Sequence, residues 1–447
     1  MKTCIFGRMS NRSYWLKSGA YSMMQRGAAF LFGFGSYVFL VRYLSQEDFG
    51  VWTLYVVVST TVEMSRASFI QNAFVKFFNE TDINKERLFA SSFFLNAAST
   101  VLFIIGLVGL IPLMQSFWHS ELIGVLVLWY CATCVVLAPF TQINYLEQAN
   151  HSFKGVFWSS TVRQGFFFAV VIICYWFIPG LPLVFFASMQ TLGAFLGLLT
   201  AYFISRKIIP TNYSIDWSLF RRLFRFGKYI LGTGVTSAVG KNADQVILGN
   251  VSHPIVAMYN VGVRILNFIE IPSAAISNVV YPKIAARAST DGKEGIRDLY
   301  EKSVATILGF ILPVIFVILM MPEFIIRLTA GDRYVAAVDV LRIMVLASLL
   351  APFNIQLGSA CEVMNKPQMA FYINLVSNIL NVILNITLIS YFGAIGAAIS
   401  FAITVTFIFL VGQLYLRRQI GISFTRIFTR LIEFYSSGIT GIFQYFR

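Results

Sequence analysis

The sequence predicts an all-α polytopic membrane protein with about twelve transmembrane helices, arranged as two six-helix bundles and followed by a C-terminal interfacial helix. Composition gives the first reason. Of 447 residues, 57% are hydrophobic and only 12% are charged, about half the charged share of a soluble domain. The second reason is a succession of apolar runs, each long enough to cross a hydrocarbon core of about 30 Å. The third is a strong asymmetry of basic residues between successive loops.

The apolar runs follow one another with short polar interruptions, so each is expected to form one membrane-spanning helix. We expect these helices at residues 18–41, 51–77, 89–115, 121–146, 154–178, 182–204, 224–250, 255–281, 302–326, 335–362, 368–391 and 394–416. Small residues such as Gly193 and Gly197 recur within the runs and are expected to let helices approach closely.

The longest polar interruption near the middle of the chain is the basic stretch 205–228, which contains Pro210. We therefore expect an N-terminal six-helix bundle over residues 1–210 and a C-terminal six-helix bundle over residues 211–418. An even number of helices gives both halves the same orientation, as in transporters built from parallel repeats.

The remaining segment, residues 419–447, predicts a cytoplasmic amphipathic tail. Its apolar residues form one stripe, and Arg426 and Arg430 lie off that stripe, which is typical of a helix in the membrane interface. The stripe comprises Phe424, Ile427, Phe428, Leu431 and Tyr435. The alternative is a further membrane span, which the polar run 436–438 interrupts.

The net charge of +14 would suggest a nucleic-acid partner in a soluble protein, but its distribution indicates membrane topology. The cations concentrate in the segments 2–17, 76–87, 206–228, 283–302 and 417–430, whereas the intervening loops are almost free of them. By the positive-inside rule, both termini are expected in the cytoplasm. We expect no nucleic-acid partner.

Among the cations within the predicted spans we single out five: Arg26, Arg66, Arg163, Lys241 and Arg264. A centrally placed Arg or Lys costs about 2.5–3.5 kcal/mol on insertion scales. These side chains must therefore face a partner or a water-filled cavity. A cationic interior in a polytopic protein predicts transport of an anionic substrate, and we take all five as candidate substrate-binding residues.

Two of these cations have an acidic neighbour at helical spacing. Glu63 and Arg66 are three residues apart, as are Lys241 and Asp244, so each couple can form an ion pair on its own helix. A structural pair and a substrate contact both remain open for them.

The other three cations, Arg26, Arg163 and Arg264, have no acidic residue at helical spacing. We expect them to bind substrate and to line one central cavity.

Among the acidic residues within spans, Glu63, Asp244 and Glu270 are candidate ion-coupling groups. A buried carboxylate favours its protonated form, so it can load and release an ion during transport. The alternative is a carboxylate that stays permanently paired.

Asparagines recur along the eleventh predicted span at positions 374, 378, 381 and 385, a spacing that places them on one helix face. They predict a polar wall beside water or sugar hydroxyls, with Asn374 and Asn378 as substrate-binding residues. Interhelical hydrogen bonding is the rival interpretation.

Signals for an enzyme, a cofactor or a metal are poor. The run "GTGVTSAVGKN" lacks the first glycine and the final hydroxyl of a phosphate-binding loop, because Val235 and Asn242 stand at those places. Cys131 and Cys134 form a CxxC inside an apolar run, where packing is the expected role. We expect no cofactor and no metal.

Five motifs, in order, carry a resemblance to a known family. They are "RYLSQEDFGVW", "DQVILGN" with "AMYNVGVRI", "VVYPKIA", "LTAGDRYVAAVDVLRIM" and "FGAIGAAIS". Together they resemble the polysaccharide transporter family, the Wzx-type flippases of lipid-linked O-antigen and capsule repeat units. The sequence departs from the family's pattern at Ala257 and Met258, where relatives have a small residue and glycine.

The resemblance implies a fold similar to MATE exporters and to the lipid II flippase, in the MOP superfamily. It implies a flippase that moves an undecaprenyl-pyrophosphate oligosaccharide from the cytoplasmic to the periplasmic leaflet of the bacterial inner membrane. Alternating access would be driven by an ion gradient. Partners would be membrane lipids, a polysaccharide polymerase and a chain-length regulator. The alternatives are a MATE-like drug or cation antiporter and, more weakly supported, a membrane polysaccharide polymerase or ligase.

Overall fold

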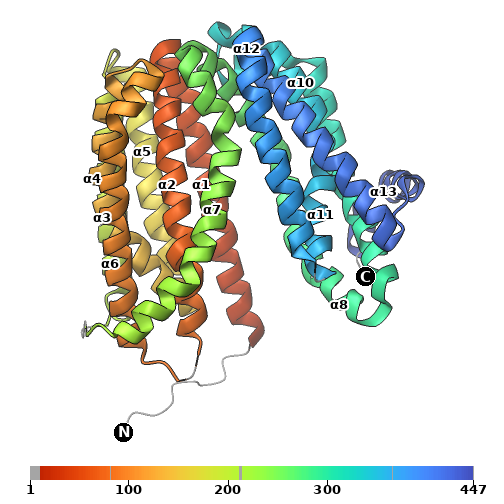
Figure 1. Ribbon diagram of the computed structural model, residues 1–447, viewed down its shortest axis with the longest axis horizontal. Coiled ribbons are helices and arrows are strands. Elements are labelled where there is room, and N and C mark those ends of the chain that lie inside the picture. The colour runs from red at the N-terminus through yellow and green to blue at the C-terminus, as the bar shows by residue number, and fades with distance from the viewer. Residues whose placement is uncertain (1–10, 81, 211–213, 365, 446–447) are drawn as a thin grey trace. The chain divides into compact units, whose positions relative to one another are not determined.

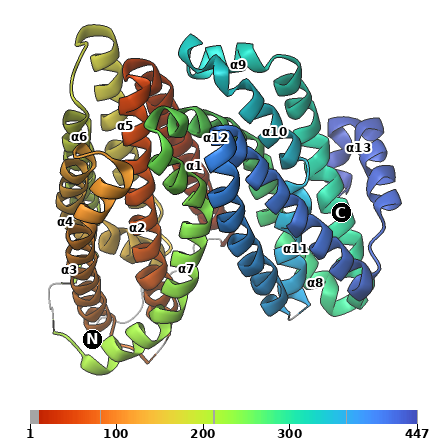
Figure 2. The same ribbon diagram turned by 45° about the horizontal axis from the view of Figure 1, so that its top comes forward.

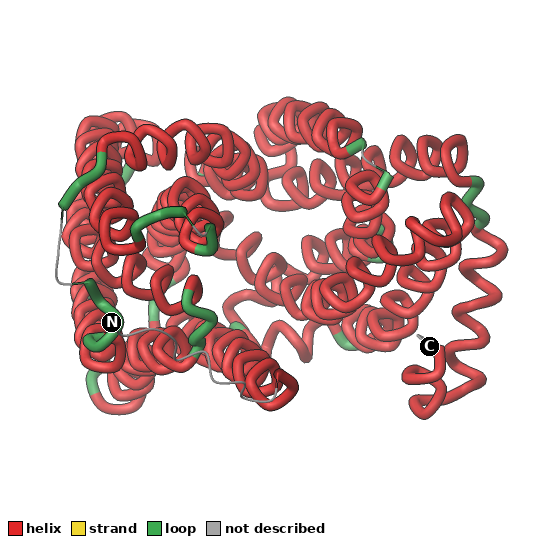
Figure 3. The backbone as a smooth tube through the Cα atoms, turned by 90° about the horizontal axis from the view of Figure 1, so that it is seen from below, coloured by secondary structure: helices red, strands yellow, loops and turns green. Residues whose placement is uncertain are grey.

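The computed structural model describes residues 11–80, 82–210, 214–364 and 366–445, and within them the chain is helical and contains no strand (Figures 1 and 3). Positions 2–10 of the first basic segment lie outside the described residues. The chain divides into two compact units, Met1–Asn242 and Ala243–Arg447. The division falls inside one helix, α7. The expected bundle boundary at residue 210 stays a prediction.

Unit 1 contains six complete helices and the first part of α7. They are α1 (Asn11–Tyr43), α2 (Gln46–Phe78), α3 (Lys85–Trp118), α4 (Leu122–Ala149), α5 (Lys154–Phe177), α6 (Leu183–Ser205) and α7 (Trp217–Val251). Within this bundle α4 packs against α2, α3 and α6, and α5 packs against α1 and α6 (Figure 1).

Helix α2 is largely buried and positions the candidate site. It begins at an N-cap, Ser45, whose side chain accepts a hydrogen bond from the Asp48 backbone N–H. Its C-terminal half contributes Phe69, Ile70, Phe74 and other aromatic residues to a buried apolar cluster shared with α3, α4 and α7. Burial of several aromatic side chains at one level fixes these helices relative to one another.

Unit 2 contains the end of α7 and the helices that follow. They are α8 (His253–Met320), α9 (Pro322–Thr329), the 3-10 helix η1 (Asp332–Ala337), α10 (Val338–Ser348), α11 (Ala351–Val363), α12 (Pro367–Ile420) and α13 (Phe424–Tyr445). Helix α8 packs against α10 and α11, and α12 packs against the same two helices (Figure 2).

The two longest helices are each interrupted by a glycine in the left-handed region. Gly292 divides α8 at φ 58°, and Gly393 divides α12 at φ 56°, a conformation that costs glycine little. Just after the second break, a Cβ at Gly396 would lie 2.1 Å from the Leu388 carbonyl oxygen. The two arms of α12, before and after Gly393, therefore approach closely at this turn. The predicted spans 368–391 and 394–416 correspond to these two arms.

Within the described residues, seven segments are long and apolar enough to cross a membrane, and eight of the twelve expected spans fall in them because α12 holds two. The count of twelve remains a prediction. The four other expected spans lie in α1, α2, α7 and the first arm of α8. They carry seven of the ten candidate site residues: Arg26, Glu63, Arg66, Lys241, Asp244, Arg264 and Glu270. Charged residues make these segments the least compatible with lipid.

The C-terminal helix α13 packs against α8 (Figure 2). The Arg430 guanidinium donates hydrogen bonds to the carboxylate and to the backbone carbonyl oxygen of Asp298. A terminal nitrogen of Arg430 also lies 3.8 Å from the Glu301 carboxylate. Only part of the predicted apolar stripe is buried in the structure. Ile427 and Leu431 are buried, whereas its three aromatic members, Phe424, Phe428 and Tyr435, are exposed.

Replacing Arg430 by Met is expected to loosen α13, because Glu301 is fully buried and would lose its neighbouring cation. The loss should be roughly 1.5–3 kcal/mol of local stability. Hydrogen exchange of residues 424–436 measures it. Arg426→Met on the same helix is the control, since Arg426 is exposed. Equal protection in both variants would contradict the anchoring role.

Candidate functional site

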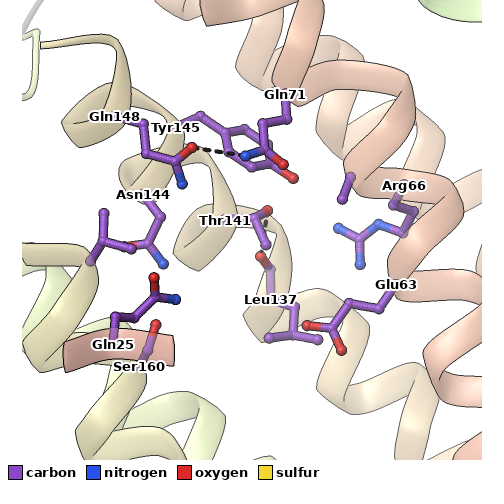
Figure 4. Close-up of a pocket in the computed structure, with 12 residues that line it drawn as sticks. Gln25, Glu63, Arg66, Gln71, Leu137, Thr141, Asn144, Tyr145, Gln148 and Ser160 are labelled. Atoms are coloured by element: carbon purple, nitrogen blue, oxygen red, sulfur yellow. Dashed lines mark hydrogen bonds between the residues drawn. The ribbon is translucent and has the colours of Figure 1, made fainter. Parts of the chain in front are cut away.

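Unit 1 contains a polar cavity of about 150 Å³ between α1, α2, α4 and α5 (Figure 4). Such a volume accommodates about five water molecules, at roughly 30 Å³ each. Its lining is mostly amides, hydroxyls and charges: Gln25, Glu63, Arg66, Gln71, Thr141, Asn144, Tyr145, Gln148 and Ser160, with Ala67, Leu137 and Val156. A polar cavity of this size among membrane helices is hydrated or holds a polar ligand.

Arg66 is the buried cation of this cavity, with 5% of its surface exposed. Its Nη2 donates a hydrogen bond to Asn96 Oδ1 at 3.3 Å. Asn96 is held in turn by its own donation to the Ala138 carbonyl oxygen at 3.0 Å. Among the described residues, Arg66 Nε is buried and makes no hydrogen bond. A buried guanidinium with an unsatisfied donor is costly unless a ligand or water completes it.

Glu63 forms an ion pair with Arg163 of α5, at 3.0 Å between Oε1 and Nη1. The partner of Arg163 therefore comes from another helix, which spacing along α5 could not reveal. A pair within α2, between Glu63 and Arg66, was one of two open interpretations; in the structure Glu63 bonds Arg163 and Arg66 bonds Asn96. The guanidinium of Arg163 also lies 5.6 Å from the centre of the Phe140 ring.

The position of Arg163 depends on small residues of α6. A Cβ at Gly193 would lie 2.9 Å from the Arg163 carbonyl oxygen, and one at Gly197 would lie 3.0 Å from Arg163 Cβ. Helix α6 therefore approaches α5 at the turn that carries the cation, as small residues allow in membranes.

Gly193→Ala is expected to push α5 away from α6 and to lengthen the contact between Arg163 and Glu63, at a cost of about 1–3 kcal/mol. The matched control is Gly165→Ala on α5, because a Cβ there meets Phe32 at 3.6 Å, an ordinary contact distance. Thermal unfolding of both purified variants checks this. A Gly193 variant as stable as the Gly165 variant would show that the close approach is unimportant.

The cavity lining contains one cation, Arg66, and one acid, Glu63. Glu63 forms its ion pair with Arg163, which lies outside the lining, so two cations share one acid. The side chains of this pair are both partly exposed, at 26% for Arg163 and 37% for Glu63. The arrangement can hold an anion by charge-assisted hydrogen bonds to Arg66.

Unit 2 contains a second buried polar cluster, centred on Asp244 at the end of α7. Its carboxylate accepts hydrogen bonds from the Tyr259 hydroxyl and from the Asn385 amide. Asn385 also donates to Asn381 Oδ1 at 2.9 Å, and Asn381 donates to Thr404 Oγ1 at 3.4 Å. The cluster joins α7, α8 and both arms of α12, and it places a buried carboxylate among neutral oxygen-bearing side chains.

The remaining predicted residues lie outside both clusters. Arg26, Lys241 and Glu270 are exposed on α1, α7 and α8. Arg264 is half-buried on α8. Because Arg264 belongs to unit 2, the cavity expected to join it with Arg26 and Arg163 remains a prediction.

Two of the four asparagines on α12 enter the buried cluster, and they are not the two proposed to bind substrate. Asn381 and Asn385 are buried, whereas Asn374 is exposed and donates to the Ala370 carbonyl oxygen of its own helix. Asn378 is half-buried. Roles for Asn374 and Asn378 in binding substrate remain predictions.

Sequence reasoning missed Asn96 and Tyr259 as supporting residues. Asn96 holds Arg66 from α3, and Tyr259 holds Asp244 from α8. Each is polar within an apolar run, a weak signal that many packing residues share. Among the described residues no group of His, Cys, Asp and Glu is arranged to hold a metal ion.

The family model of the polysaccharide biosynthesis proteins matches residues 39–339, and the chain belongs to that family. This agrees with the resemblance carried by the sequence motifs.

Curated relatives are named as transporters of glycans. The "Probable low-salt glycan biosynthesis flippase Agl15" of Haloferax volcanii is 25% identical over 207 residues, covering 46% of this chain and 43% of its own. The "Putative O-antigen transporter" of Shigella flexneri is 24% identical over 240 residues, covering 51% and 57%. The chain thus spans about half the length of the curated relatives it matches.

Solved structures show the same fold. The lipid II flippase MurJ in an inward closed conformation matches with a TM-score of 0.76 at 14% identity, over 92% of this chain and 90% of the other. An inward-facing MATE transporter of the MOP superfamily matches with a TM-score of 0.73 at 13% identity, over 87% and 94%. The fold is therefore that of MurJ and the MATE transporters, and the chain is a polytopic membrane protein.

Proposed function

We propose that this protein is a flippase that carries a polyprenyl-diphosphate-linked oligosaccharide, an O-antigen or capsule repeat unit, across the membrane. The sugar and diphosphate cross through the protein while the prenyl chain stays in lipid. Movement is from the cytoplasmic to the periplasmic leaflet by alternating access. Family membership and the names of the relatives support the class of activity.

The single observation that carries the proposal is Arg66, a buried guanidinium with an unsatisfied Nε in a polar cavity. A permanent cation in a membrane bundle needs a compensating anion or water. Diphosphate oxygens suit the planar fork of a guanidinium. A drug antiporter for cations would need acidic residues in excess, whereas here the acid of the cavity is already paired with Arg163.

Coupling to an ion gradient is assigned to Asp244. Its carboxylate is buried and accepts hydrogen bonds from uncharged groups, among them Tyr259 and Asn385. A carboxylate in that setting gains much from a proton or a small cation. Loading of that ion would change the free energy of the buried cluster and favour one conformation over another. Glu63 and Glu270 remain further candidates for coupling.

The proposed location is the bacterial inner membrane, with both termini in the cytoplasm, as the basic loops indicate. Helix α13 is proposed to lie in the cytoplasmic interface, because Phe424, Phe428 and Ile432 recur every four residues and are exposed. A polysaccharide polymerase and a chain-length regulator are the proposed protein partners.

Complementation tests the function. A strain lacking its own flippase, supplied with this chain and one defined repeat unit at a time, should regain surface polysaccharide with the matching unit. Cationic dye efflux is measured in the same cells. Restored polysaccharide with unchanged efflux supports the flippase. Efflux without polysaccharide for any unit would establish the antiporter alternative instead.

A further inference from the structure

A second cavity of unit 1 lies apart from the cavity of Arg66. It is a groove of about 610 Å³ between the end of α2 and the start of α7. Four of its eight lining residues are cations, Lys76, Arg221, Arg222 and Arg225, and none is acidic. The others are Phe77, Ser218, Phe226 and Ile230.

The start of α7 is firmly held against unit 1, so the groove is a built feature. Leu223 is fully buried in the apolar cluster of α2, α3 and α4. A Cβ at Gly227 would lie 2.3 Å from the Phe69 carbonyl oxygen, so α7 lies almost directly on the α2 backbone at this glycine. Figure 1 shows α7 beginning across one end of the bundle and then running along it.

The residue before α7 fixes where the helix begins. Asp216 Oδ1 accepts hydrogen bonds from the Ser218 N–H at 2.8 Å and the Ser218 hydroxyl at 2.6 Å. These bonds lower the pKa of the exposed Asp216 carboxyl below its ordinary value. The Asp216 backbone is also tied to Ser91 of α3 by two hydrogen bonds.

Aromatic rings orient two of the cations. The Lys76 ammonium lies 4.6 Å from the centre of the Phe226 ring, and the Arg222 guanidinium lies 4.5 Å from that of Phe77. Glu80 takes one bond from Arg222, at 2.8 Å. Lys76, Arg221, Arg222 and Arg225 carry four positive charges, and Glu80 carries one negative charge. The groove therefore has a net charge of three positive charges.

The groove lies beside an exposed aromatic face. Trp217 and Phe224 are seven residues apart on α7 and are 58% and 48% exposed. Arg221 and Arg225, four residues apart, share the neighbouring face. Exposed aromatic residues next to cations are typical of a helix at the membrane interface. A ligand of this groove would therefore have an anionic head and an apolar tail.

We propose that this groove is a loading site for a lipid-borne diphosphate at the cytoplasmic surface, occupied before the head group reaches the cavity of Arg66. The inference rests on the proposed function and extends it. Three guanidinium groups and one ammonium favour two linked phosphates over the single charge of a phosphodiester lipid. The exposed aromatic residues accommodate the first part of a prenyl chain.

The test uses the full-length protein in phosphatidylcholine nanodiscs, with farnesyl diphosphate as the probe. Arg221→Gln with Arg225→Gln is expected to weaken its binding roughly tenfold or more, through the loss of two charge-assisted contacts. The matched control is Arg206→Gln with Lys207→Gln, which removes two exposed charges from the end of α6. The control should change binding less than twofold. Equal loss in both double variants would overturn the site, as would equal affinity before and after the Arg221 and Arg225 changes.

Competitors identify the source of the diphosphate. Inorganic pyrophosphate and phosphatidylglycerol should each compete at least tenfold more weakly than farnesyl diphosphate. Pyrophosphate competing equally would show that no lipid tail is recognised, and phosphatidylglycerol competing equally would assign the groove to bulk anionic lipid. Either result overturns the proposal.

Transport kinetics separate this proposal from the function on which it rests. With a polyprenyl-diphosphate glycan in proteoliposomes, the Arg221 and Arg225 double variant should raise the half-saturating substrate level and keep the maximal rate. A wild-type protein that moves no glycan would refute the proposed function. A wild-type protein that moves glycan, with unchanged half-saturation in the double variant, refutes the loading site alone.

Discussion

Arg66→Met abolishes glycan translocation while the protein stays folded: this is the expected result if Arg66 holds the diphosphate. Truncating one partner of a buried hydrogen-bonded charge pair costs about 2–5 kcal/mol, which corresponds to a loss of roughly thirtyfold or more in substrate affinity. Translocation in proteoliposomes and the thermal unfolding temperature are measured together. Arg66→Lys keeps the charge without the planar fork, so it should retain only part of the activity.

Stability distinguishes a substrate-binding Arg66 from a structural one. Arg66 hydrogen-bonds the neutral side chains of Asn96 and Cys134, and its buried Nε is unsatisfied in the described chain. Removing such a charge relieves a desolvation cost, so Arg66→Met should unfold at the same or a higher temperature than wild type. A variant that unfolds several degrees earlier and keeps its translocation activity would show that Arg66 supports the fold instead.

Asp244→Asn is the second change with a large expected effect. The amide keeps an acceptor for Tyr259 and has the size of the carboxylate, but it cannot take up a proton or compensate a cation. Translocation by this variant should no longer respond to an imposed proton or sodium gradient. Proteoliposomes with each gradient imposed separately give the measurement.

Two further variants are compared with Asp244→Asn, one as a control and one as a milder change in the same cluster. Asp339→Asn changes an exposed carboxylate that pairs with Arg342 at 3.3 Å, and it should leave the gradient response intact. Tyr259→Phe removes one donor to Asp244 and should shift the ion concentration that gives half-maximal rate. Gradient dependence that survives in Asp244→Asn would assign coupling to Glu63 or Glu270.

Much of the helical pattern could be predicted from the sequence, because apolar length decides where helices form in a membrane. The predicted spans 154–178 and 182–204 agree closely with α5 (Lys154–Phe177) and α6 (Leu183–Ser205). The predicted pair 368–391 and 394–416 corresponds to the two arms of α12 around Gly393. The short helices α9 (Pro322–Thr329) and η1 (Asp332–Ala337) overlap the ends of the predicted spans 302–326 and 335–362 and were not predicted as separate elements.

The candidate site was only partly predictable. A place in an apolar run did not decide burial, since Arg66 is buried whereas Arg26 and Lys241 are exposed, and it did not reveal the partners of Arg66. Arg163 meets Glu63 across 100 positions of sequence, and Asn385 meets Asp244 across 141. Contacts of this kind depend on how helices pack, which the pattern of one helix does not encode.

The asparagines of α12 show the same limit. Their spacing predicts one polar helix face. Which part of that face is buried depends on the second arm of α12 and on α7, since Thr404 and Asp244 supply the partners of Asn381 and Asn385. The sequence therefore indicated a polar stripe but did not indicate which of its asparagines are buried.

The central claim is that a buried, incompletely satisfied Arg66 carries the anionic head of a lipid-linked glycan through the protein. Its most direct test is the leaflet accessibility of a fluorescent polyprenyl-diphosphate glycan in proteoliposomes holding wild type or Arg66→Met at equal protein density. We expect wild type to expose the glycan to the opposite leaflet and Arg66→Met to leave it at the protein-free level. Equal translocation by both proteins would contradict the account.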